Sequence, residues 1–340
     1  MPLKKILLRG PNWVGDSVLA IPAMKAVRAR FPEAEITLLV RPWVAGVFRT
    51  APFIDHLWSE PRPAGISEWM RITNSIRKSR FDLALLFPNS FESAVMIFLG
   101  GVPQRIGYAT DGRRWLLTNS LKPASGKHHQ VHYYLALAGA LSAEVTHPSI
   151  SIEANAEEKA QAERLLASEG VSPGRRYLVL NPGAAYGSAK RWNEEGFADA
   201  GDTLATELDL DVAIVGSEKE RSIGESIQKR MRSRVAVLSG RTSMETLIGV
   251  ISGSSLVLTN DSGPMHVAAA LGVPTVAIFG STDDVVTGPW GPRARVVREP
   301  VECSPCMLRE CPIDHRCMKG ITVEMVLAAA KSLLQAEAAK

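Results

Sequence analysis

Residues 256–266 read Leu-Val-Leu-Thr-Asn-Asp-Ser-Gly-Pro-Met-His, and this stretch decides the fold. An apolar run ends in a short polar turn, and an Ala-rich helix follows over 267–271. We expect Asp261 or Ser262 to cap that helix and Pro264 to lie in its first turn. The free N–H groups of such a turn, with the helix dipole behind them, bind anions. The order of strand, polar turn and helix predicts a phosphate site, although an ordinary βα turn has the same pattern.

The same alternation of strand and helix runs along all 340 residues. Strands are predicted at 5–9, 35–40, 82–87, 105–108, 177–180, 212–215, 235–238, 256–258 and 275–279. Helices are predicted at 17–31, 67–80, 92–99, 128–141, 157–169, 197–208, 244–252 and 322–338. We therefore predict an α/β protein of two Rossmann-like doubly wound parallel-sheet domains, 1–152 and 153–340, with a cleft between their sheet edges. A return of the last helix toward the N-terminal domain is left open.

Composition is that of a globular protein, with 46% hydrophobic and 22% charged residues. The sequence has no apolar run of membrane-spanning length. The start Met-Pro-Leu-Lys-Lys-Ile is read as a first strand and not as a signal peptide, so a cytoplasmic protein is expected.

Charge is unevenly distributed along the chain, although the net charge is only +4. Residues 1–150 carry 18 Lys and Arg against 10 Asp and Glu, or +8, and the remainder carries 21 against 25, or −4. A basic N-terminal half predicts an anionic partner, such as a phosphorylated glycan or an anionic membrane surface, although a solvated basic face would look the same. No nucleic-acid-binding motif accompanies the charge, so nucleic acid is not expected as a partner.

Two loops after predicted strands carry the chemistry that we expect. The first, Gly10 to Asp16, ends in a lone carboxylate, which either caps the next helix or acts as a general base on a sugar hydroxyl. The second spans residues 182–192. Its small residues, such as Gly183 and Ala184, let backbone N–H groups face a ligand, and Lys190 and Arg191 add positive charge for a phosphate. A solvated Lys-Arg pair is the alternative for the second loop.

Two further residues could contact a nucleotide. Glu218 comes just after a predicted strand, where a carboxylate often accepts from ribose hydroxyls, although a helix N-terminus also favours an acidic residue. His266 lies on the first turn of an apolar helix, where a core histidine is more common than a ligand contact. The Asp209-Leu210-Asp211 triplet resembles a metal-binding motif but precedes a strand and is read as a turn. No P-loop motif is present.

Four cysteines fall within fifteen residues, at Cys303, Cys306, Cys311 and Cys317, with His315 among them. In a protein of the cytoplasm this spacing favours a metal over disulfides, and zinc is the first candidate. The spacing does not follow a standard pair of CxxC motifs, so four reduced thiols are an equal alternative. Any metal here is expected to be structural, and no cofactor is expected to be required for catalysis.

Taken together, four segments resemble the ADP-heptose:lipopolysaccharide heptosyltransferases, in the same order and over nearly the whole chain. These segments are Gly10–Asp16, Pro88–Phe91, Pro182–Trp192 and Thr259–Leu271. The W-V-G-D form of the first loop and the A-K-R-W form of the third resemble the type II members. The cysteine cluster lies outside this pattern.

The resemblance implies a GT-B fold, with the acceptor on the N-terminal domain and the sugar nucleotide on the C-terminal domain. It implies an inverting, metal-independent transfer from ADP-L-glycero-D-manno-heptose to the lipopolysaccharide inner core, at the cytoplasmic face of the inner membrane. By this resemblance, Asp16 is the general base and Lys190 stabilises the leaving diphosphate. The donor side then comprises Gly183, Ala184, Lys190, Arg191, Glu218, Asn260, Asp261, Ser262, Gly263, Met265 and His266, and the acceptor side Asn12, Trp13, Gly15, Asn89 and Ser90. Another GT-B enzyme, such as a type I or III heptosyltransferase or an epimerase, and a non-catalytic sugar-binding module are the alternatives.

Overall fold

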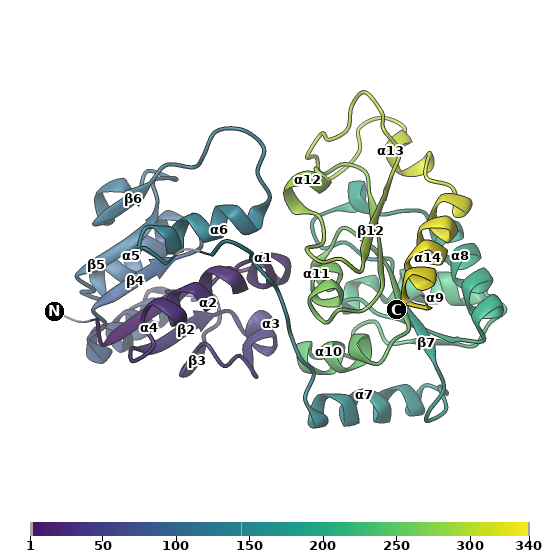
Figure 1. Cartoon of the computed structure of the whole chain (residues 1–340), viewed down its shortest axis with the longest axis horizontal. Helices are drawn as coiled ribbons and strands as arrows, with labels where there is room; N and C mark the ends of the chain where they lie inside the picture. Colours follow the sequence, from purple (N-terminus) through teal and green to yellow (C-terminus); the bar gives the residue numbers. More distant parts are fainter. Residues whose placement is uncertain (1–2, 144, 339–340) are drawn as a thin grey trace. The chain divides into compact units, whose positions relative to one another are not determined.

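The computed structural model of the chain describes residues 3–143 and 145–338 (Figure 1). It divides into two compact units, residues 1–150 and 151–340, so that the division falls two residues from the predicted boundary. Each unit is built around one sheet of six parallel strands. The α/β class and the two doubly wound sheets are confirmed.

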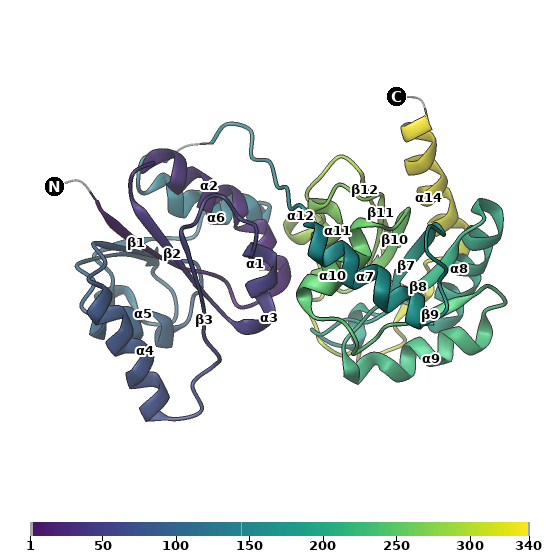
Figure 2. The same cartoon turned by 90° about the horizontal axis from the view of Figure 1, so that it is seen from below.

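The sheet of the first unit has the strand order β3-β2-β1-β4-β5-β6. Its strands are β1 (Lys5–Arg9), β2 (Glu35–Val40), β3 (His56–Ser59), β4 (Leu83–Leu86), β5 (Gln104–Tyr108) and β6 (Asn119–Leu121). Its helices are α1 (Val14–Leu19), α2 (Ile21–Arg30), α3 (Pro42–Ala45), η1 (Gly46–Phe48), α4 (Ile66–Ser79), α5 (Phe91–Leu99), η2 (Arg114–Leu116) and α6 (Gln130–Gly139). Helices α2 and α6 cover one face of the sheet, and α4 and α5 cover the other (Figure 2). The strand order reverses between β1 and β4, and open α/β sheets bind ligands at the carboxyl edge of such a switch point.

The sheet of the second unit, β12-β11-β10-β7-β8-β9, repeats this topology, with its switch point between β7 and β10. Its strands are β7 (Tyr177–Asn181), β8 (Asp211–Ile214), β9 (Val235–Val237), β10 (Leu256–Asn260), β11 (Thr275–Phe279) and β12 (Ala294–Arg298). Its helices are α7 (Ala156–Ser168), η3 (Ser188–Lys190), α8 (Glu194–Leu208), η4 (Glu218–Glu220), α9 (Arg221–Arg230), α10 (Met244–Ser252), α11 (Gly263–Ala270), α12 (Asp284–Thr287), α13 (Arg316–Lys319) and α14 (Val323–Ala338).

One predicted helix is divided in the structure. The prediction of a single helix over 17–31 was wrong, because α1 ends at Leu19 and α2 begins at Ile21. Pro22 has no N–H to donate to the carbonyl four residues earlier, so a continuous helix would lose a hydrogen bond there. The last helix, α14, packs its buried residues Val326, Ala330 and Leu333 into the core of the second unit.

The outer strands β3, β6 and β12 were not predicted from the sequence. They lie at sheet edges, where one side of the strand is unpaired. Strand β3 has no fully buried residue, so the apolar run that marks the inner strands is missing from it. No helix in the described ranges is long and apolar enough to cross a membrane.

Candidate functional site

The turn after β10 meets the loop after β7 at the switch point of the second unit. Asn260 is fully buried, and its side-chain oxygen accepts from the N–H of Trp192 at 3.0 Å. Its side-chain nitrogen donates to the carbonyl of Pro182 at 2.7 Å. The amide therefore holds both ends of the loop 182–192, which gives this predicted donor-side residue a positioning role.

A buried ion pair joins this loop to the turn. Lys190 Nζ lies 2.5 Å from Asp261 Oδ2, with side chains only 13% and 5% exposed. The same carboxylate oxygen accepts from the hydroxyl of Thr282 at 2.6 Å, and the ammonium lies 4.8 Å from the centre of the Tyr186 ring. Because the lysine is held from two sides, its charge has a fixed place at the sheet edge.

The capping prediction for α11 was wrong in its detail. Ser262 is the N-cap residue, but no side-chain hydrogen bond caps the helix. The Asp261 carboxylate instead accepts from the ammonium of Lys190 and the hydroxyl of Thr282. The Ser262 hydroxyl accepts from the side-chain amide of Asn181 at 2.6 Å. Helix α11 begins at Gly263 with a proline in its first turn, as predicted, and Met265 and His266 are buried.

Beneath this loop lies a buried carboxylate that sequence reasoning missed. A Cβ atom added to Gly183 would lie 2.3 Å from the carboxylate of Glu220, so alanine would fit there only if the Glu220 side chain moved. Glu220 Oε2 accepts from the N–H and the hydroxyl of Ser217 at 2.8 and 2.7 Å. Arg191 Nη2 lies 4.0 Å from Glu220 Oε1. Ala184, the residue after Gly183, is buried. The Ser-x-x-Glu spacing of a capping box was the sequence signal available for this residue.

Glu218, which the sequence placed on the donor side, lies at the surface in η4. Its side chain is 67% exposed and forms an ion pair with Arg221 at 2.9 Å. The hydrogen bond from Arg221 lowers the pKa of the Glu218 carboxyl. An ionised, exposed carboxylate could accept from ribose hydroxyls only in competition with this arginine.

In the first unit, the candidate base lies at the switch point, in the first turn of α1 after strand β1. Tyr134 Oη, from α6, donates to Asp16 Oδ1 at 2.8 Å. Tyr134 is only 4% exposed, and burial, followed by the negative charge of Asp16, raises the pKa of its hydroxyl well above the usual value. The hydroxyl therefore keeps its proton and serves as a neutral donor. Asp16 does not cap the helix, because Trp13 is the N-cap residue and no side-chain cap bond forms.

The adjacent tyrosine of α6 holds the loop after β4, on the other side of this switch point. Tyr133 Oη and the Asn89 side-chain amide lie within 2.8 to 3.0 Å of each other. The Tyr133 ring stacks on Tyr108 with 4.0 Å between ring centres. Ser90 caps α5 through its hydroxyl. Sequence reasoning selected Asp16 and Asn89 but missed the two tyrosines that hold them.

The remaining acceptor-side candidates lie in the loop after β1. Asn12 accepts from Arg9 Nη2 at 2.6 Å through its side chain, and its carbonyl accepts from Trp43 Nε1 at 2.7 Å. Trp13 is 56% exposed, and Gly15 is half-buried in α1. Burial, followed by the charge of Arg41, lowers the pKa of Arg9 to about 9. Aromatic rings and a buried guanidinium therefore surround the loop that carries the candidate base.

The cysteine-rich segment packs directly on the loop that carries Lys190. Tyr186 Oη donates to the carbonyl of Met307 at 2.8 Å, and the N–H of Ala189 donates to the carbonyl of Arg309 at 3.0 Å. His315 Nε2 lies 3.0 Å from the carbonyl of Ala189. Although the two segments are distant in sequence, the cysteine-rich segment supports the lysine loop.

The four cysteines form no disulfide. Burial, followed by the charges of the other three thiols, raises the pKa of the Cys317 thiol. Within residues 3–143 and 145–338, no group of three or more His, Cys, Asp or Glu side chains is placed to hold a metal ion. The geometry gives the zinc prediction no support, and we derive no step through a metal.

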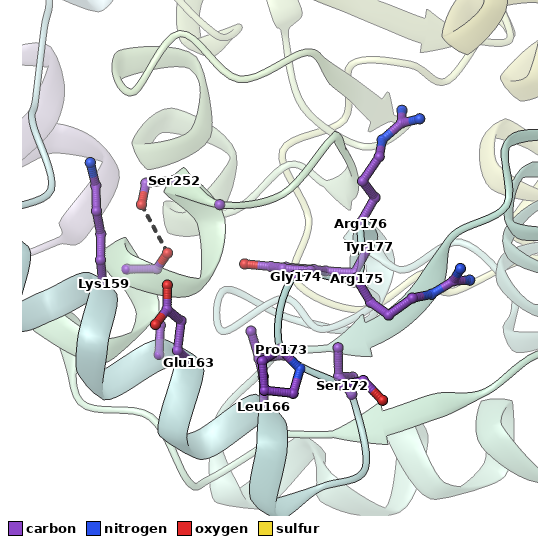
Figure 3. A pocket seen from close by; sticks show the side chains of 14 residues that line it. Lys159, Glu163, Leu166, Ser172, Pro173, Gly174, Arg175, Arg176, Tyr177 and Ser252 are labelled. Carbon is purple, nitrogen blue, oxygen red and sulfur yellow. Dashed lines mark hydrogen bonds between the residues drawn. The ribbon is translucent and has the colours of Figure 1, made fainter.

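A separate cavity of about 420 Å³ lies between α7, residues 172–176 and the end of α10 (Figure 3). Tyr177, the first residue of β7, lines this cavity, so it lies at the amino edge of the sheet. Among its described lining residues there is no residue of the predicted donor side. Ligands of open α/β sheets bind at the opposite edge, so we do not assign the donor to this cavity.

Two doubly wound units with polar switch points define the architecture of a GT-B glycosyltransferase. A solved structure of E. coli ADP-heptose lps heptosyltransferase II is 28% identical to this chain, with a TM-score of 0.82, and the match covers 98% of this chain and 99% of that one. A family model for glycosyltransferase family 9 (heptosyltransferase) matches residues 69–316.

The chain belongs to glycosyltransferase family 9, the heptosyltransferases. It is 32% identical to lipopolysaccharide heptosyltransferase 2 of Salmonella typhimurium, in a match that covers 86% of this chain and 88% of that protein. It is 31% identical to lipooligosaccharide heptosyltransferase 2 of Campylobacter jejuni, with 97% and 98% covered. The resemblance predicted from the four loop segments is confirmed.

Proposed function

We propose that this chain transfers L-glycero-D-manno-heptose from ADP-heptose to heptosyl-Kdo2-lipid A, and so adds the second heptose of the lipopolysaccharide inner core. The names of the relatives that are 31% and 32% identical support the choice of product. The observation that carries the chemistry is the buried Lys190–Asp261 pair at the switch point of the second unit. A fixed cation at this edge suits a leaving diphosphate.

Asp16 acts in this proposal as the general base of an inverting displacement. It takes the proton of the acceptor hydroxyl while that oxygen forms the new bond to the anomeric carbon. A base must be ionised, reachable and correctly oriented. The hydroxyl of Tyr134 donates to the half-exposed Asp16 and orients the carboxylate, and as a neutral donor it does not cancel the charge.

Lys190 acts on the leaving group. The bond between the anomeric carbon and the diphosphate oxygen breaks, and the electron pair leaves with ADP. Lys190 and the N–H groups of the first turn of α11 provide positive charge where this negative charge grows. With a cation supplied by the chain itself, the transfer needs no metal ion.

The acceptor is linked to a lipid, so we place the enzyme at the cytoplasmic face of the inner membrane as a peripheral protein. The charge of +8 on residues 1–150 suits both the phosphorylated glycan and an anionic membrane surface.

The test measures ADP release with ADP-heptose and acceptors that end either in Kdo or in the first heptose. We expect turnover only with the acceptor that ends in heptose. Asp16→Asn should lower turnover by about 10²- to 10⁴-fold and keep donor binding. Lys190→Ala should lower turnover and also weaken ADP binding. Full activity of Asp16→Asn would refute the role of Asp16 as the general base. Turnover on the Kdo acceptor alone would refute the proposal that the chain adds the second heptose.

A further inference from the structure

An exposed aromatic surface lies on the first unit, beside the candidate acceptor residues. It consists of Phe91 and Phe98 at the two ends of α5, Leu99 and Trp115, which are 39%, 41%, 40% and 67% exposed. The Trp115 ring lies 6.1 Å from the Phe91 ring and 6.4 Å from the Phe98 ring, so these side chains form one continuous patch. We call these four residues the α5 patch. An exposed apolar patch of this kind marks an interaction site.

Positive charge surrounds the α5 patch. The guanidinium of Arg105 lies 5.2 Å from the centre of the Phe98 ring, and Arg77 donates to the carbonyl of Leu99. Arg114 is exposed and precedes Trp115 in η2. Against these three cations stand two carboxylates, Asp111, which accepts from the N–H of Phe91, and the half-buried Glu92 in the first turn of α5. Apolar rings surrounded by guanidinium groups suit a surface that is apolar inside and anionic outside.

The patch is joined rigidly to the candidate acceptor loop. Arg113 is fully buried and donates to the carbonyls of Pro88 and Ser90 and to the hydroxyl of Ser93. This side chain connects the turn that carries Trp115 to the loop that carries Asn89 and Ser90. A ligand held at this loop therefore lies at a fixed place relative to the α5 patch.

We propose that the α5 patch docks the first unit on an anionic lipid bilayer. Tryptophan and arginine are the residues that favour the boundary between lipid headgroups and acyl chains. The charge of +8 on residues 1–150 attracts the anionic headgroups, and the patch inserts its rings among them. The choice of a bilayer over a protein partner rests on the proposed function, since the acceptor of that reaction is itself anchored in lipid.

Vesicle sedimentation tests this proposal with the full chain. We expect binding to phosphatidylcholine vesicles that contain about 30% phosphatidylglycerol, and much weaker binding without the anionic lipid. Trp115→Ser should lower the partition coefficient by about tenfold, because one large ring no longer enters the interface. Arg114→Gln should lower it by about fivefold on anionic vesicles only. Ile313→Ser is the matched control, because Ile313 is 60% exposed but belongs to the second unit.

The outcomes separate this proposal from the proposed function. With a lipid-free acceptor, Trp115→Ser should keep the kcat/KM of the native chain, whereas Asp16→Asn should lose it and still bind vesicles. Equal vesicle binding by Trp115→Ser, Ile313→Ser and the native chain would overturn the docking proposal. A native chain that binds no vesicles would overturn it as well. In that case, a change in oligomeric state on Trp115→Ser would assign the patch to contacts between copies of the chain.

Discussion

Replacing Tyr134 with phenylalanine should move the pH dependence of the transfer. The hydroxyl of Tyr134 donates to Asp16 and so stabilises the charged form of that carboxylate. Phenylalanine keeps the ring, which packs 5.7 Å from Phe87, and removes only the donor. Loss of the donor raises the pKa of Asp16. Because the base must be ionised, the fall in activity toward acid pH should then begin at a higher pH than in the native chain.

The size of the shift follows from the strength of the bond. A hydrogen bond to a charged group contributes about 1.5 to 3 kcal/mol. Asp16 is half-exposed, so water replaces part of the lost donor and the lower end of that range applies. One pKa unit corresponds to about 1.4 kcal/mol. The acidic limb of the pH profile should therefore move up by about one pH unit, while the rate well above that limb changes little.

The assay is kcat/KM for ADP release, measured across the pH range for the native chain and for Tyr134→Phe. Tyr133→Phe is the matched control, because that neighbouring hydroxyl contacts Asn89 instead of Asp16. It should leave the acidic limb in place and raise KM for the acceptor. If the limb of Tyr134→Phe coincides with that of Tyr133→Phe, Tyr134 does not act through the carboxylate and the reasoning fails.

Three further predictions concern the second unit. Lys190→Met should lower the free energy of unfolding in urea by about 3 to 5 kcal/mol, because it leaves the buried Asp261 carboxylate without its cation. The double variant with Asp261→Leu should lose less stability than the sum of the two single losses. Additive losses would show that the two groups are not coupled. Gly183→Ala should lower the free energy of unfolding by about 1 to 3 kcal/mol, because the new Cβ meets the Glu220 carboxylate. Adding Glu220→Ala to this variant should recover part of that loss. No recovery would mean that another contact excludes the Cβ. Metal analysis of protein purified without chelator tests the cysteines: a structural zinc site predicts one zinc per chain, and less than about one tenth would reject it.

The inner strands and the loops of both switch points could be predicted from the sequence, because their signals are local. A buried parallel strand is a short apolar run, and a glycine-rich polar loop after it marks the carboxyl edge. Edge strand β3 gave no such signal, since two of its four residues are exposed and the other two are only half-buried. The division between α1 and α2 could also have been predicted, because Pro22 lies well inside the helix predicted over 17–31.

The partners of the site residues could not be predicted, because they come from distant parts of the chain. Tyr134 lies 118 residues from Asp16, and Asp261 lies 71 residues from Lys190. Which side chains meet at a sheet edge depends on how the helices pack, and local patterns do not record that. Asp261 illustrates the consequence. The local pattern predicts a helix cap, but the lysine on another loop takes the carboxylate.

The two switch points share one topology but hold their polar groups in different ways, and the difference fits the two roles. In the second unit the Asp261 carboxylate, itself held by the hydroxyl of Thr282, fixes Lys190 and keeps its charge in place before a phosphate arrives. In the first unit the neutral hydroxyl of Tyr134 donates to Asp16. A nearby cation would lower the pKa of the carboxylate and weaken it as a base, whereas a neutral donor orients it at less cost to its basicity. Exchange of Tyr134 for lysine should therefore impair proton transfer more than its removal does.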